Sequence, residues 1–257
     1  MPTVQSRGVP IHYEVIGQGR PIVLVHGFSS SFDGDWRQSG WVDFLVGEDR
    51  KVIGPDCRGH GSSGKPHSPG AYAGNQIPDD VLAVMDAVGI ERADIMGYSM
   101  GALVTLSLLA RNAERFTSAV VGGIGLPRLA ADPQRRAALV AALEAADPAT
   151  ISEPTALRFR QTAERRGNDL LALAAFQRSE RTQADQAALL RLELPLLVVV
   201  GDQDEVLESA RQLVAAVAGA ELVTLTGEDH RSAIAAQGYK QAVRRFLKAG
   251  QDVVTRA

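Results

Sequence analysis

The sequence lacks the residues and runs that several protein classes require. A single cysteine, Cys57, excludes an intrachain disulfide and any thiolate cluster for zinc or iron–sulfur. No apolar run approaches the ~20 residues that a membrane span needs, and residues 1–7 have no apolar signal core. The cytoplasm is therefore the expected location.

An excess of charge of one sign is also missing. The formal net charge is -3, which provides no electrostatic basis for binding nucleic acid or an anionic membrane surface. No metal or nucleotide motif is present. The 257 residues are enough for one sizeable α/β domain, or for a core domain with a modest insertion.

Short β-branched runs alternate with helical stretches along most of the chain. The run at residues 21–25 is continuously apolar, which is typical of a strand buried on both faces. Further strands are expected at residues 3–5, 9–16, 51–54, 93–96, 116–121, 195–200 and 221–225. This alternation predicts an α/β fold with a mostly parallel sheet and helices on both faces.

Residues 126–192 differ in composition, with many alanine, arginine, leucine, glutamine and glutamate residues and few β-branched ones. We expect a helical cap here, inserted into a core domain of residues 1–125 and 193–257. Its helices are expected at residues 133–145, 154–166, 168–178 and 183–192. Its arginines could form an anion site, but a solvated helix face is the better default; they include Arg135, Arg136, Arg158 and Arg160.

Residues 97–101 read Gly-Tyr-Ser-Met-Gly, between an expected strand and the apolar helical stretch 103–110. A strand, a tight turn and a helix are the context of a nucleophile elbow, in which Ser99 stands clear of the sheet. A side chain at either glycine would strike the neighbouring strand or helix. The alternative is a serine that N-caps a helix after a glycine turn. A base, an acid and an oxyanion site elsewhere must decide between them.

Four loops follow strands of the expected parallel sheet: residues 26–31, the Ser99 elbow, residues 201–206 and residues 226–230. Functional loops of such sheets lie at the carboxyl ends of the strands. The four loops should therefore meet at one edge.

A base for the elbow serine must come from five histidines. His12 lies in a strand, where we expect a surface or half-buried residue without chemistry. His26 precedes a glycine and is more plausibly structural, and His60 and His67 lie in loops rich in glycine, proline or serine. His230, after the last strand, is the best candidate to accept the hydroxyl proton.

A carboxylate on the far ring nitrogen of His230 would fix its tautomer and stabilise the imidazolium. Asp204 is the preferred acid. Asp202 is the competitor, and its alternative role is turn formation or capping. Asp229 would have difficulty reaching the ring of its own neighbour.

The glycine-rich segment 55–64 carries two charged candidates, Asp56 and Arg58. An internal ion pair and hydrogen bonds that hold the loop are a better interpretation than catalysis. Cys57 has no evident cationic partner, so we expect an inert small residue rather than a reactive thiol.

The order Ser99, Asp204, His230 is that of the α/β-hydrolase triad, and the sequence resembles that family. The motifs that carry the resemblance cover nearly the whole chain: residues 26–28, 56–63, 97–101, 201–204 and 229–230. The chain looks most like the short-lidded esterase, lactonase and carbon–carbon-bond hydrolase branch.

The resemblance implies Ser99 as nucleophile, Asp204 as acid and His230 as base. It also implies an oxyanion hole made by the backbone N–H groups of Phe28 and Met100, with residues 126–192 as the lid. Haloalkane dehalogenases and epoxide hydrolases of this fold carry aspartate at the nucleophile position, so the serine disfavours those two activities.

The expected function is a cofactor-free serine hydrolase acting on a small, largely apolar ester, lactone or related carbonyl compound. A carbon–carbon-bond hydrolase of a diketone-type substrate, a perhydrolase and a ligand receptor are the alternatives. Tyr98, Phe159 and Phe176 are candidate pocket residues, although core packing within the lid is an equal interpretation for the two phenylalanines. No metal site is expected, and the oligomeric state is open.

Overall fold

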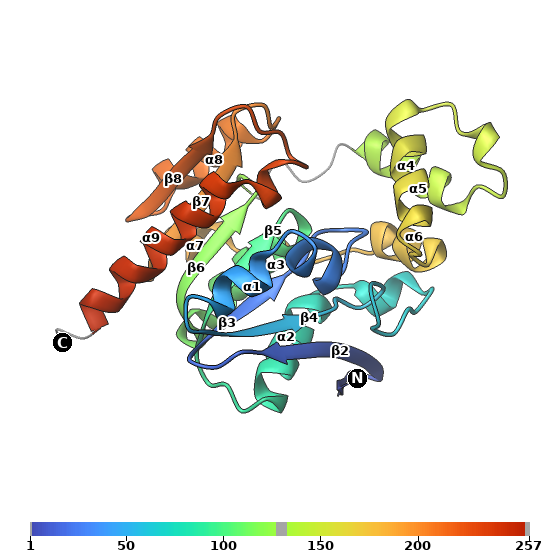
Figure 1. Ribbon diagram of the computed structural model, residues 1–257. Helices are drawn as coiled ribbons and strands as arrows, with labels where there is room; N and C mark the ends of the chain where they lie inside the picture. Colours follow the sequence, from blue (N-terminus) through green and yellow to red (C-terminus); the bar gives the residue numbers. More distant parts are fainter. Residues whose placement is uncertain (1, 127–132, 255–257) are drawn as a thin grey trace.

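The computed structural model describes residues 2–126 and 133–254, which form an eight-stranded sheet flanked by helices (Figure 1). The strands are β1 (Thr3–Ser6), β2 (Val9–Ile16), β3 (Arg20–Val25), β4 (Arg50–Pro55), β5 (Ala93–Tyr98), β6 (Phe116–Gly122), β7 (Leu196–Gly201) and β8 (Ala220–Leu225). Their order across the sheet is β1-β2-β4-β3-β5-β6-β7-β8. The pairs β1–β2 and β2–β4 are antiparallel and the others are parallel. The predicted α/β class with a mostly parallel sheet is confirmed.

Helices cover both faces of this sheet because successive strand residues point to opposite sides. On one face, Ile95 and Val198 join a core closed by α2, α3 and α8. On the other face, Met96 and Leu197 join a second core closed by α1 and α9. The bounds are α1 (Trp41–Val46), α2 (Gln76–Ala87), α3 (Met100–Asn112), α8 (Leu207–Ala216) and α9 (Gln237–Val254). Short helical turns are η1 (Asp33–Arg37), η2 (Pro69–Tyr72), η3 (Ala113–Arg115), η5 (Pro148–Thr150) and η6 (Ala233–Ala235).

The strand order reverses at β3, which lies between β4 and β5. The chain runs outward from β3 to β4 and then crosses back to β5. Val25 pairs with Gly97, so β3 and β5 end side by side. A crevice at the carboxyl ends of two such strands is where α/β sheets bind ligands. The loop after β3 and the turn after β5 therefore become neighbours.

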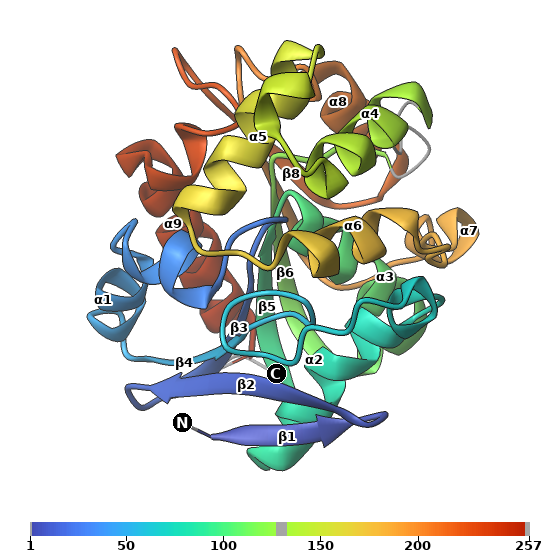
Figure 2. The ribbon, with the colours of Figure 1, turned by 90° about the vertical axis from the view of Figure 1, so that its right-hand side faces the viewer.

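The described residues between β6 and β7 form four α-helices: α4 (Pro133–Glu144), α5 (Pro154–Arg165), α6 (Leu170–Arg178) and α7 (Gln186–Leu189). Helices α4, α5 and α6 gather on one side of the molecule, in front of the strands in Figure 2. They pack around a small apolar cluster that includes Leu143, Ala163 and Leu173.

These helices agree with the four expected from the sequence, although α7 is shorter than residues 183–192. Three of these helices have a carboxylate at the N-cap. Glu153, Asp169 and Asp185 each accept a backbone N–H from the first turn of the helix that follows. Residues 127–132 of the predicted cap lie outside the described ranges.

The packing of α3 on β3 generates a prediction about Gly101. A Cβ at this position would lie 2.0 Å from the carbonyl oxygen of Val25, so Gly101→Ala must push the helix away from the strand. We expect the free energy of unfolding in urea to fall by about 2 kcal/mol or more. Gly70→Ala is the matched control, since its Cβ would meet only Ser68 Oγ at 3.7 Å. The control should change stability by less than about 0.5 kcal/mol, and equal losses in both variants would contradict this account.

Candidate active site

Ser99 occupies the sharp turn between β5 and α3. Its backbone angles, φ 54° and ψ -113°, are rare for a residue with a side chain. The turn is held because the Ser99 carbonyl accepts hydrogen bonds from the N–H groups of Ala102 and Leu103, at 3.0 and 3.1 Å. The Ser99 N–H donates to the Gly122 carbonyl of β6 at 2.8 Å. A strained conformation persists only where the surroundings determine it in this way.

Two side chains from the loops after β7 and β8 converge on this serine. His230 Nε2 lies 3.0 Å from Ser99 Oγ, and His230 Nδ1 lies 2.8 Å from Asp204 Oδ2. The Asp204 side chain is 0% exposed, whereas that of His230 is 43% exposed. This chain of contacts has the geometry that general-base activation of a hydroxyl requires.

A further hydrogen bond fixes the carboxylate, and another fixes the backbone that carries the imidazole. Asp204 Oδ1 accepts a hydrogen bond from the Val206 N–H at 3.1 Å. The Tyr98 hydroxyl donates to the carbonyl of His230 at 2.7 Å. The last residue of β5 therefore holds the loop that carries the imidazole.

Asp202 and Asp229, which also lie near this end of the sheet, accept backbone hydrogen bonds that stabilise turns. Asp202 Oδ1 accepts a hydrogen bond from the Gly227 N–H at 2.9 Å. Asp229 Oδ1 accepts two N–H bonds, both 2.8 Å, from the turn that follows it. The structure thus brings Asp204, and not Asp202, to His230.

The loop after β3 runs against the elbow. A Cβ at Gly27 would lie 3.6 Å from Ser99 Cβ, so the chain passes the serine at close range just before Phe28. The Gly27 N–H donates to Asp35 Oδ2 at 2.7 Å, and the Ser30 hydroxyl donates to Asp35 Oδ1 at 2.5 Å. One carboxylate of η1 therefore fixes the loop.

Two backbone N–H groups remain unused beside the serine. Met100 is the first residue of α3, a position at which the N–H has no intrahelical acceptor. Within residues 2–126 and 133–254, neither the Met100 nor the Phe28 N–H donates a hydrogen bond to another protein group. The two groups predicted to form an oxyanion hole are thus available for one.

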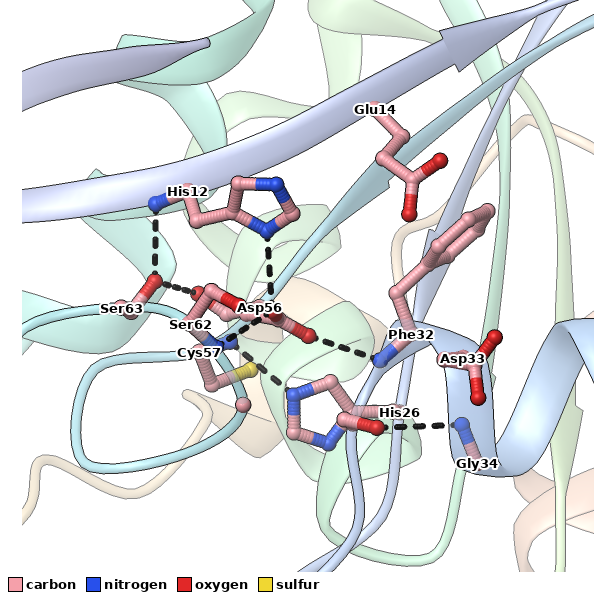
Figure 3. Close-up of polar contacts among 12 residues, drawn as sticks. His12, Glu14, His26, Phe32, Asp33, Gly34, Asp56, Cys57, Ser62 and Ser63 are labelled. Atoms are coloured by element: carbon pink, nitrogen blue, oxygen red, sulfur yellow. Dashed lines mark hydrogen bonds and ion pairs between the residues drawn. The ribbon is translucent and has the colours of Figure 1, made fainter. Parts of the chain in front are cut away.

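A buried carboxylate also anchors the loop after β3 (Figure 3). Asp56 accepts the N–H groups of Phe32 and Ser62, both at 2.8 Å, and lies 2.9 Å from His12 Nδ1. Burial alone would raise the pKa of Asp56, but His26 and these hydrogen bonds outweigh burial and hold that pKa below its ordinary value. The Asp56 anion therefore joins β2 to the loops after β3 and β4.

The segment around Asp56 corrects two expectations. His12 is buried at 4% exposure, whereas a surface or half-buried residue was expected, and its ring faces this carboxylate. Arg58 forms no ion pair with Asp56; its Nη2 lies 2.5 Å from Asp80 Oδ1 of α2, since the loop turns back over that helix. Cys57 is buried, and burial raises the pKa of its thiol, which favours the expected inert residue over a reactive thiol.

A cavity of about 370 Å³ opens at Ser99. Its lining is apolar where Phe28, Ile77, Leu103 and Phe176 contribute. Its polar side includes Gln177, Ser179, Arg181, Thr182 and Gln183. The rings of Phe28 and Phe176 stack with their centroids 5.0 Å apart. The cavity therefore has room and apolar surface for a small organic molecule.

The three predicted pocket residues have different positions. Phe176 lines the cavity. Phe159 does not, but it stacks on Phe28 with the centroids 5.3 Å apart and so supports the lining. Tyr98 is only 4% exposed and belongs to the core on the α9 side of the sheet, next to Tyr239. The prediction for Tyr98 fails because its side chain points to the face opposite the cavity.

The arginines of the inserted helices differ in whether they line the cavity. Arg135 contacts Glu205 at 2.8 Å, Arg158 is exposed, and Arg160 donates to carbonyls at the end of α4. Arg136 lines the cavity, together with Arg181, which the sequence analysis did not single out. Arg181 lies outside the helices in an irregular segment, where no periodic pattern could have marked it.

Across the described part of the chain, no group of three or more histidine, cysteine or carboxylate residues could hold a metal ion. The helices found in that part are all too short or too polar to cross a membrane.

Residues 20–145 match the family model described as the alpha/beta hydrolase fold. A 2-hydroxymuconate semialdehyde hydrolase of Pseudomonas putida is 33% identical over 111 residues, covering 43% of this chain and 38% of the relative. Epoxide hydrolase 3 of Siraitia grosvenorii is 30% identical over 102 residues, covering 40% of this chain and 31% of the relative. The chain thus spans only about a third of the length of these curated relatives.

Solved structures match over nearly the whole chain. A hydrolase from Pseudomonas aeruginosa superposes with a TM-score of 0.79 at 26% identity, covering 96% of this chain and 97% of that one. An enol-lactonase from Burkholderia xenovorans superposes with a TM-score of 0.76 at 24% identity, covering 96% of this chain and 100% of the other. The second likeness concerns the fold alone.

His60, below the cavity, generates a prediction about pH. Its ring meets the edges of Phe28 and Phe176, with centroids 5.5 and 5.8 Å away. Burial, and after it the proximity of His26, lowers the pKa of His60 to about 3. An unfolded histidine takes up a proton near pH 6.5. Folding stability must therefore fall as the pH drops from about 6.5 towards the folded-state pKa.

We expect His60 to account for a loss of about 2 kcal/mol in unfolding free energy between about pH 6.5 and 4.5. Urea denaturation at several pH values would measure it, and His60→Asn should have a correspondingly shallower pH dependence. His67→Asn is the control, since that side chain is 52% exposed. The same slope in wild type and His60→Asn would refute the burial argument.

Proposed function

The chain belongs to the α/β-hydrolase fold family, and we propose that it is a serine hydrolase of small ester, lactone or related carbonyl substrates. The observation that supports this most directly is the alignment of Ser99, His230 and Asp204, with contacts of 3.0 and 2.8 Å. The cavity that opens at the serine would hold the substrate.

In the proposed reaction, His230 Nε2 takes the hydroxyl proton as Ser99 Oγ attacks the carbonyl carbon. The tetrahedral oxyanion accepts hydrogen bonds from the Phe28 and Met100 N–H groups, which are fixed before the charge develops. His230 then protonates the leaving group. A water activated by the same imidazole hydrolyses the acyl-enzyme, while Asp204 remains ionised and orients the ring.

We assign residues 126–192 to a lid and residues 1–125 and 193–257 to the core. Three observations support this division. Phe176 of α6 lines the cavity. Asn168 Nδ2 donates to the Ser29 carbonyl at 3.0 Å, and Arg166 Nη1 lies 3.4 Å from the same oxygen. The inserted helices thus supply part of the pocket and hold the loop that carries Phe28.

Cleavage of a carbon–carbon bond in a diketone-type substrate is the second candidate, favoured by the 33% identity to the semialdehyde hydrolase. Epoxide hydrolysis is disfavoured despite the epoxide hydrolases among the relatives. Attack of the Ser99 hydroxyl on an epoxide would leave an ether, and an activated water that cleaves esters does not cleave ethers.

The role of Ser99 can be tested by labelling with a fluorophosphonate and intact-mass analysis. Wild type should gain one adduct and Ser99→Ala none. The rate with 4-nitrophenyl butyrate should also fall by a factor on the order of 10³ or more in Ser99→Ala. Ser107→Ala is the matched control, because Ser107 of α3 lines the same cavity and its loss should not affect labelling. An adduct on Ser99→Ala, or none on folded wild type, would rule the mechanism out.

The assignment of the acid can be tested with two asparagine variants. Asp204→Asn removes the charge that selects the imidazole tautomer, so kcat should fall by a factor on the order of 10⁴. Asp202→Asn alters only a turn contact and should cost less than about tenfold in kcat. Circular dichroism would verify that both variants fold. Similar kcat values for the two variants would remove Asp204 from the proposed triad.

A further inference from the structure

Two arginines and no carboxylate line the described part of the cavity at Ser99. Arg136 comes from α4, and Arg181 from the segment after α6. Both side chains are half-buried. Neither forms an ion pair with a carboxylate in residues 2–126 or 133–254. A charged group taken partly out of water without a counterion is costly. The two positive charges in the cavity lining therefore lack a negative partner among the residues described.

Arg181 is held in place by its backbone and its side chain. The Gly74 N–H donates to the Glu180 carbonyl at 2.8 Å, and the Thr182 N–H donates to the Gly74 carbonyl at 3.0 Å. The guanidinium carbon lies 4.0 Å from the centre of the Phe176 ring. The backbone on both sides of Arg181 is thus fixed, and its guanidinium lies over an aromatic ring that lines the cavity.

One edge of this guanidinium is free. Arg181 Nη1 donates to the Phe176 carbonyl and, at 2.8 Å, to Ser179 Oγ. Nε and Nη2 have no acceptor among the residues described, and neither is buried from solvent. These two N–H groups form the parallel fork that binds both oxygens of a carboxylate.

Arg136 adds a second positive charge. Its Nε donates to the Gln177 carbonyl, and its Nη2 donates to the Ser179 carbonyl at 2.6 Å. Its Nη1 has no acceptor in residues 2–126 or 133–254. Burial, and next the proximity of Arg136, lowers the pKa of Arg181 to about 10. Arg181 therefore remains cationic at neutral pH, and the guanidinium of Arg136 is close enough to repel it. A bound anion would relieve this repulsion.

We propose that the substrate carries a carboxylate, which the Nε and Nη2 edge of Arg181 binds while Arg136 supplies further positive charge. The inference rests on the proposed serine-hydrolase function and specifies its substrate class: monoesters, lactones or diketone-type compounds that bear an acid group. The apolar lining from Phe28 and Ile77 then contacts the carbon chain between the acid and the reacting carbonyl. The expected specificity is therefore for an acidic substrate rather than a wholly apolar one.

Both arginines also hold carbonyls at the end of α6, so the test must separate substrate recognition from support of the helix. The substrates are mono-4-nitrophenyl adipate, which has a free carboxylate, and its methyl ester, which has the same chain without the charge. The measured quantity is the ratio of kcat/KM for the acid to kcat/KM for the methyl ester. A general disturbance of the cavity lowers both values and leaves this ratio unchanged.

Wild type should prefer the acid. Arg181→Gln should lower the ratio by about tenfold to hundredfold, the usual effect of losing a hydrogen bond to a charged group. Arg181→Lys keeps the charge but loses the fork, so its ratio should lie in between. Arg178→Gln is the matched control, since Arg178 ends α6 and pairs with Glu144 at 2.5 Å outside the cavity lining. Its ratio should equal that of wild type.

Binding alone gives a second readout. Adipate dianion should bind Ser99→Ala in calorimetry, and the double variant with Arg181→Gln should bind it at least about tenfold more weakly. Absence of fluorophosphonate labelling in wild type would contradict the hydrolase function and leave this binding result to decide on the anion site. Normal labelling with no preference for the acid, or a ratio that Arg181→Gln does not change, would overturn the carboxylate proposal alone.

Discussion

The sharp turn at Ser99 is the constraint on which the rest of the site depends. The elbow closes only because two glycines let the chain come close: a Cβ at Gly97 would lie 2.2 Å from the Gly101 carbonyl, and one at Gly101 would lie 2.0 Å from that of Val25. This close packing of α3 on β3 and β5 brings the serine to the crevice between two parallel strands. The other loops then need only follow their own strands to reach it.

Buried ion pairs stabilise the loops around that crevice. Asp56 contacts His12, and Arg58 pairs with Asp80. Each pair joins segments far apart in the sequence. Removing one partner would leave a buried charge uncompensated, which is far more costly than losing an exposed pair. The loop after β3 therefore keeps its position although few of its own residues are large and apolar.

Much of this arrangement could be predicted from local pattern. Strand periodicity, the glycines of the elbow and the position of His230 after the last strand lead to the fold and to three converging side chains. Patterns fail where the partner is distant in the sequence. His12 is buried because it contacts Asp56, 44 residues away. Tyr98 faces the second core because alternate residues of β5 point to opposite faces of the sheet. Arg181 lies in an irregular segment whose position depends on Gly74, a contact that no local signal reveals.

The hydrogen bonds from Arg166 and Asn168 to the Ser29 carbonyl have a mechanical consequence. Ser29 follows Phe28 directly, and its own φ of 59° leaves its backbone little tolerance for displacement. An outward swing of the connection between α5 and α6 would pull away one of the supports of that loop. The loop after β3 and the connection between α5 and α6 are thus mechanically coupled, and a displacement of one is transmitted to the backbone of the other.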